Sequence, residues 1–136
     1  MIAALIFVIS MAALLQFFFL HCRSILAYSG RVELSEHIRE VTGLASQDVA
    51  AGDFERLVQL ARLCPERGDD RKDIRIVGVY YRLLHAIGRA TRWLIPSVAE
   101  WTDTERRGCS YFAAVALDRR ISYSRDLFSQ QVAEHL

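Results

Sequence analysis

The feature that most constrains this chain is an uninterrupted apolar run at its start. The first 20 residues, MIAALIFVISMAALLQFFFL, carry no charge, and the first charged side chain is that of Arg23. Only Ser10 and Gln16 are polar within the run. At a rise of 1.5 Å per residue, about 20 residues cover the roughly 30 Å hydrocarbon core of a bilayer. The run therefore predicts a single transmembrane helix.

The run does not have the layout of a cleavable secretory signal. Such a signal has a positively charged start, an apolar stretch of about 7 to 15 residues and a small-x-small exit. Here no cation precedes the apolar stretch, and the best exit, Ala27-Tyr28-Ser29, lies beyond His21 and Arg23. We therefore expect the segment to be retained as an anchor.

The charges that follow the run predict its orientation. His21, Arg23 and Arg31 come directly after it, and the first acidic residue is Glu33. Positive flanks are retained on the cytoplasmic side of a membrane. We therefore expect a single-pass protein of the cell (inner) membrane, with its N-terminus outside and its C-terminal domain in the cytoplasm.

The rest of the chain predicts helices. It shows no sustained alternation of period two, and its two prolines, Pro65 and Pro96, stand between segments of helical periodicity. We divide the chain into a transmembrane anchor with a short juxtamembrane extension, residues 1–29, and a cytoplasmic helical domain, residues 30–136. The expected fold class is all-α, with one N-terminal transmembrane helix followed by a small bundle of about four helices.

Two shorter segments of this domain have helical spacing and clear ends. One is expected over residues 35–42, where Gly43 stops it. The other is expected over residues 54–64, with Asp53 as its N-cap and Pro65 at its end.

Two longer helices complete the predicted bundle. The hydrophilic stretch ERGDDRKD, residues 66–73, is expected to be a surface loop that leads into a helix over residues 70–94. After Pro96, residues 97–101 are expected to form another turn of helix or a loop. Thr102 and Glu105 then have the spacing of a capping box, which predicts that the last helix begins there. The apolar face of this last helix comprises Cys109, Phe112, Ala116, Tyr123 and Leu127.

The most distinctive segment outside the anchor is IRIVGVYYRLLHAIGRATRWL, residues 74–94, because it has four arginines and one histidine but no acidic residue. At about 100° per residue, these five side chains fall within roughly a third of a turn. We call them the arginine stripe, which consists of Arg75, Arg82, His85, Arg89 and Arg92. The apolar residues on the opposite side are Ile76, Tyr80, Leu83, Leu84, Ile87 and Leu94.

Three interpretations of the arginine stripe are open. Its basic side can meet anionic lipid headgroups, with Trp93 at the boundary, or it can dock on an acidic protein surface, since guanidinium groups pair well with carboxylates. It can also be a solvated face that is balanced by acids on neighbouring helices, such as Glu36, Glu40 or Asp118. The net charge of +1 without a like-charge tail argues neither for nor against a nucleic-acid partner, and we expect none for the stripe.

Two polar residues near the end of the apolar run have alternative roles. Gln16 shares a helical face with Ile9 and Ala12, so its amide either bonds another transmembrane element or reaches toward the headgroups. His21 lies at the depth where an imidazole can ligate a haem or a chlorophyll, but we favour its reading as the polar end of the span.

Catalytic motifs are absent from the sequence. It contains no H-E-x-x-H, no G-x-S-x-G and no glycine-rich phosphate loop, and its three cysteines lack the spacing of a zinc site. A pairing of Cys64 with His85 as nucleophile and base is the one enzymatic alternative, and we expect Cys64 to be a core thiol instead. We therefore predict no enzyme, no metal, no cofactor and no small-molecule substrate.

Two functional hypotheses follow, and membrane lipid is a partner in both. The first is a non-enzymatic accessory subunit that packs beside a larger membrane protein complex, for example a respiratory or photosynthetic one, and caps it with its cytoplasmic domain. The alternative is a membrane-anchored regulatory or scaffold module that recruits a soluble partner or anionic lipid through the arginine stripe.

Overall fold

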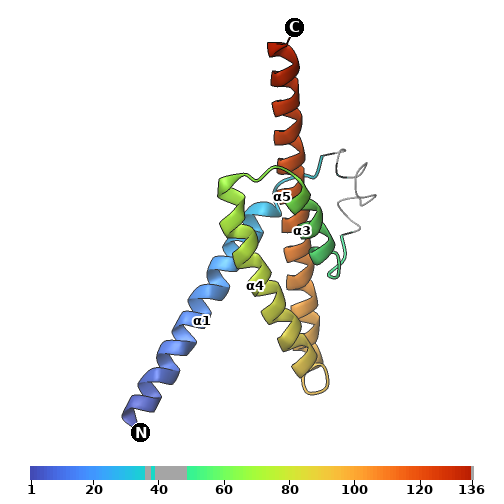
Figure 1. Cartoon of the computed structure of the whole chain (residues 1–136). Helices are drawn as coiled ribbons and strands as arrows, with labels where there is room; N and C mark the ends of the chain where they lie inside the picture. Colours follow the sequence, from blue (N-terminus) through green and yellow to red (C-terminus); the bar gives the residue numbers. More distant parts are fainter. Residues whose placement is uncertain (36–37, 39–48, 136) are drawn as a thin grey trace.

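The computed structural model describes residues 1–35, 38 and 49–135 (Figure 1). These residues form four helices and no strand: α1 (Ile2–Ser29), α3 (Phe54–Leu63), α4 (Gly68–Thr91) and α5 (Pro96–Glu134). The all-α prediction is confirmed. The described part of the bundle consists of α3, α4 and α5, with the end of α1 as the fourth helix. The helix predicted over residues 35–42 falls mostly outside the described residues.

Helix α1 runs through the apolar run and the juxtamembrane extension without a break, as predicted. It ends at Gly30, whose N–H donates to the Leu26 carbonyl at 2.9 Å. Residues 1–17 are all exposed, whereas the last third of α1 contacts α4 and α5. Figure 1 shows the first part of α1 projecting away from the other helices.

The predicted bounds of α3 are confirmed to within one residue. Asp53 occupies the N-cap position, and its carboxylate accepts a hydrogen bond from the Ala50 N–H at 2.9 Å. The chain becomes extended at Cys64, directly before Pro65. Three apolar side chains on one face are buried, namely those of Phe54, Leu57 and Ala61.

Helix α4 starts two residues earlier than predicted and ends three residues earlier. Six of the eight residues of the predicted surface loop, 68–73, are therefore helical, and Asp70 is buried rather than loop-exposed. Acids in the first turn interact favourably with the helix dipole, which explains why this hydrophilic stretch can begin a helix. Leu94, predicted for the buried face, is 79% exposed because it lies past the end of the helix.

The start predicted for the last helix is wrong, because α5 begins at Pro96 and continues through Thr102. Proline is favoured in the first turn of a helix, where its missing N–H has no intrahelical acceptor. The Thr102 hydroxyl donates to the Ala99 carbonyl at 2.8 Å inside α5, and Glu105 accepts a hydrogen bond from Tyr80 of α4. Thr102 and Glu105 therefore do not cap a helix, because Thr102 bonds inside α5 and Glu105 contacts α4.

Helix α5 forms the centre of the bundle and contacts each of the other three helices. Its middle third supplies the largest group of buried residues from any described helix: Cys109, Ser110, Phe112, Ala113, Ala114, Val115, Ala116 and Leu117. The last part of α5 extends past the other helices (Figure 1). Tyr123 and Leu127, predicted for the core face, are consequently 40% and 37% exposed, because no described helix packs beside them.

Candidate functional site

The exposed part of α1 is the first candidate surface. α1 is the one helix among the described residues that is long and apolar enough to cross a membrane, and none of its most apolar 18-residue window is buried. A continuous exposed apolar surface of this kind marks a contact with lipid or with another protein.

Aromatic contacts attach the end of α1 to the bundle. Tyr80 is fully buried in α4, and the rings of Phe18 and Phe19 meet it edge-on, with centroids 6.2 and 5.4 Å away. Phe19 also contacts Trp101 of α5, with centroids 6.2 Å apart. Edge-to-face pairs of this kind contribute about 0.5–1.5 kcal/mol beyond area burial. The apolar run therefore ends in the bundle core.

A polar link joins the same three helices. Glu105 of α5 lies 3.4 Å from Arg23 of α1, and it accepts a hydrogen bond from the Tyr80 hydroxyl of α4 at 3.1 Å. Burial, followed by the charge of Glu105, raises the pKa of the Tyr80 hydroxyl above its ordinary value. Arg23 is mostly exposed, so the ion pair is weak, and the hydrogen bond to the carboxylate carries more of the link.

Two site residues predicted within α1 lie on its outer surface. Gln16 is exposed and makes no hydrogen bond with the described residues. His21 is exposed, and its ring stacks on that of Phe17 with centroids 6.4 Å apart and an interplanar angle of 7°. A contact of Gln16 with another transmembrane element stays a prediction, and so does the assignment of His21 as the polar end of the span without a cofactor.

All five members of the arginine stripe are exposed along α4. None of them forms an ion pair with a described residue. Asp118, one of the acids proposed to balance the stripe, bonds the backbone N–H and hydroxyl of Ser35 instead. The other two, Glu36 and Glu40, lie outside the described residues. The stripe divides into two surfaces, because its two ends have different neighbours.

The first end of the stripe lines a pocket of about 460 Å³ between α3, α4 and α5. We call it the arginine pocket, because five arginines line it: Arg62, Arg71, Arg75, Arg82 and Arg120. Arg75 and Arg82 belong to the predicted stripe, whereas the other three were not predicted. Among the described residues of the lining, the one acid is Glu66, which lies 3.6 Å from Arg71.

Arg120 is the buried member of the arginine pocket, with 3% of its surface exposed. One of its terminal nitrogens donates to the Ala61 carbonyl at 2.7 Å, which ties α5 to α3. Its Nε has no hydrogen-bond partner among the described residues. Sequence periodicity carried a signal for this residue, because Arg120 interrupts the apolar face that runs from Ala116 to Tyr123.

The second end of the stripe lies beside α5, near the turn between α4 and α5. His85, Arg89 and Arg92 line a small hollow there, together with Asp103 and Arg106. The carboxylate of Asp103 pairs with Arg106 at 3.3 Å, so it does not balance the stripe.

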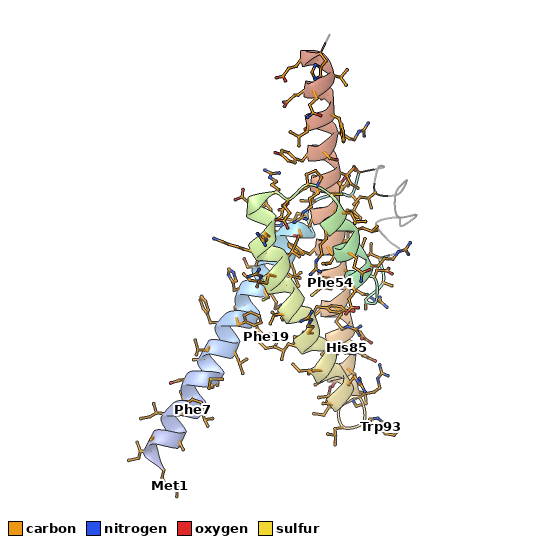
Figure 2. The ribbon with its side chains drawn as sticks, viewed as in Figure 1. Met1, Phe7, Phe19, Phe54, His85 and Trp93 are labelled. Carbon is orange, nitrogen blue, oxygen red and sulfur yellow. The ribbon has the colours of Figure 1, made fainter. Side chains whose placement is uncertain are left out.

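The α4–α5 turn exposes three consecutive large apolar side chains. We call these the turn patch: Trp93 is 93% exposed, Leu94 79% and Ile95 48%. Figure 2 shows Trp93 at the same end of the molecule as Met1 and Phe7 of α1. The turn patch and the exposed part of α1 therefore face the same side, with Arg89 and Arg92 beside the patch.

Comparisons with known proteins give no relative: no family model, no curated protein and no solved structure matches this chain. Within the described residues, no group of three or more His, Cys, Asp or Glu side chains could hold a metal ion.

Proposed function

We propose that this protein is a membrane-anchored accessory subunit without catalytic activity, which packs beside a larger membrane protein complex and caps it with its helical domain. The observation that carries the proposal is the exposed apolar part of α1, which the bundle leaves uncovered over residues 1–17. Respiratory and photosynthetic assemblies are natural hosts for such a subunit.

Gln16 supports a protein neighbour within the membrane. Its amide is exposed on α1 and has no described partner, and an amide in hydrocarbon is stabilised by a hydrogen bond across helices. Ile9 and Ala12 continue the same face, and a small residue such as alanine lets two helices approach closely.

The test is purification of the full chain in mild detergent, followed by mass spectrometry of the proteins that co-migrate. We expect a membrane protein at fixed stoichiometry that is retained at high salt. Gln16→Leu should weaken its retention, whereas Ser10→Ala, which removes the other polar group of the run, should not. Migration of the chain alone would contradict the proposal.

The second candidate is a membrane-anchored scaffold that recruits anionic lipid or a soluble partner through the arginine stripe. It is favoured by Arg89 and Arg92, which form no ion pair with a described residue and lie beside the exposed Trp93, on the side toward which α1 projects. Basic residues near a membrane surface are each attracted to anionic lipid by about 1 kcal/mol. An association of this kind should weaken steeply with ionic strength, unlike an intramembrane contact.

Orientation is proposed from the charges at the end of the apolar run. Under the positive-inside rule, Arg23 and Arg31 support a cytoplasmic position of the bundle. Protease added to intact cells should spare the bundle, whereas protease added to inverted membrane vesicles should degrade it. The reverse pattern would contradict this orientation.

A further inference from the structure

The arginine pocket has more positive charge than the described residues neutralise. Five arginines and one acid line it, which leaves an excess of four positive charges. The acid, Glu66, lies 3.6 Å from Arg71, but both side chains are more than half exposed, so this ion pair is weak. Like charges that gather around one pocket repel each other unless an anion lies between them.

Arg120 strengthens the requirement for an anion. A buried guanidinium without a counter-charge has a large desolvation penalty, and Arg120 has no acidic partner within 4 Å among the described residues. Among the described residues, its one hydrogen bond goes to the neutral Ala61 carbonyl and its Nε has no partner. An anion in the pocket would supply the missing charge and an acceptor.

The pocket also has the size and the mixed lining of a small-molecule site. Its volume of about 460 Å³ lies within the range of roughly 300–1,000 Å³ that such sites have. Val58, Ile74 and Val79 supply apolar wall between the arginines. Gly78 lines the same wall, and the absence of a side chain there leaves the pocket open along α4.

We propose that the arginine pocket binds a small soluble ligand that carries phosphate groups and is about the size of a nucleotide. Guanidinium groups bind phosphate oxygens through pairs of parallel hydrogen bonds, which a lysine cannot do. The apolar wall would contact the rest of the ligand. A lipid headgroup is disfavoured, because Arg75 lies about 24 Å along α4 from Thr91, where α4 ends before the turn patch. The inference does not depend on the proposed accessory role.

The test is isothermal titration of the full chain in uncharged detergent micelles at low ionic strength, with adenosine triphosphate as the probe and adenosine as the ligand without phosphate. We expect one saturable site for the triphosphate and no binding of adenosine. The double variant Arg75→Gln, Arg82→Gln should weaken binding at least tenfold. The matched control Arg89→Gln, Arg92→Gln removes the same charge from the same helix outside the pocket and should change binding less than twofold.

Three outcomes would overturn the proposal. Equal weakening by both double variants would mean diffuse charge attraction. No binding of either the triphosphate or pyrophosphate at millimolar concentration would leave the pocket without a phosphate ligand. Vesicles containing anionic lipid that bind through Arg75 and Arg82, with no triphosphate binding, would assign the surface to the membrane. If the first double variant melts at a lower temperature, Arg62→Gln on α3 replaces it, because Arg62 is exposed and lines the same pocket.

Discussion

Single residues in the core link the three longer helices. Cys109 is fully buried in α5, and burial, with a smaller contribution from the charge of Glu105, raises the pKa of its thiol to about 12 from an ordinary value of 9.0. The thiol therefore ionises less readily in the folded state than in the unfolded state. Its contribution to stability is full only at a pH where the thiol keeps its proton in both states.

The raised pKa of Cys109 predicts a loss of stability at alkaline pH. The contribution is fully present below about pH 9, where the unfolded thiol is also protonated, and it is lost as the pH rises toward 12, because only the unfolded state releases its proton. Urea unfolding of the full chain in micelles at pH 8 and 10.5 should show a larger decrease for the wild type than for Cys109→Ala. Identical decreases would contradict the prediction.

Glycine substitutions in α4 test how closely two helices approach each other. A Cβ at Gly88 would lie 2.8 Å from the Thr102 hydroxyl of α5, whereas a Cβ at Gly78 would meet nothing within 4 Å. Gly88→Ala should therefore destabilise the fold by about 1–3 kcal/mol through overpacking. Gly78→Ala should stabilise it by about 0.5–1 kcal/mol through helix propensity.

Thermal unfolding of both glycine variants measures these effects, and Thr102 provides a further control. Thr102→Ala removes the hydroxyl that the new methyl group would meet, so the double variant Gly88→Ala, Thr102→Ala should recover part of the stability. If Gly88→Ala were as stable as Gly78→Ala, the close approach of α4 and α5 at this point would be wrong.

At the scale of a single element, we expect the turn patch to enter the membrane interface. In anionic vesicles, Trp93 should leave water, so its fluorescence should shift to shorter wavelength and be quenched by brominated lipid. Trp101→Phe makes Trp93 the one tryptophan in the chain, which isolates its signal. Equal access of an aqueous quencher with and without vesicles would show that the turn patch does not enter the membrane interface.

Elements with local signals were predicted well, and elements defined by tertiary contacts were not. The continuity of α1 and the bounds of α3 follow from hydrophobic length, Gly30 and Pro65, which are all local. The start of α5 was misplaced because Thr102 and Glu105 bond within the bundle, which spacing alone does not reveal. The arginine stripe was also predicted correctly as one exposed side of α4, because the spacing of its residues is a local signal. The arginine pocket was not, because Arg62 and Arg120 come from other helices.

At the scale of the whole molecule, the bundle includes the end of α1. Residues 18–29 cover Tyr80 and Cys109, which are both fully buried. The predicted division at residue 30 would therefore remove part of the core. We expect a fragment of residues 18–136 to melt cooperatively and at a higher temperature than residues 31–136. Equal melting temperatures would mean that α1 does not contribute to the fold.

The central claim is that α1 anchors the chain in a bilayer, and alkaline carbonate extraction of membranes tests it most directly. The full chain should stay in the membrane pellet, and so should the conservative variant Ile9→Leu. Ile9→Asp places a charge in the middle of the exposed run and should release the chain into the supernatant, since a carboxylate at that depth costs about 2.5–3.5 kcal/mol. Release of the unmodified chain by carbonate would contradict the account.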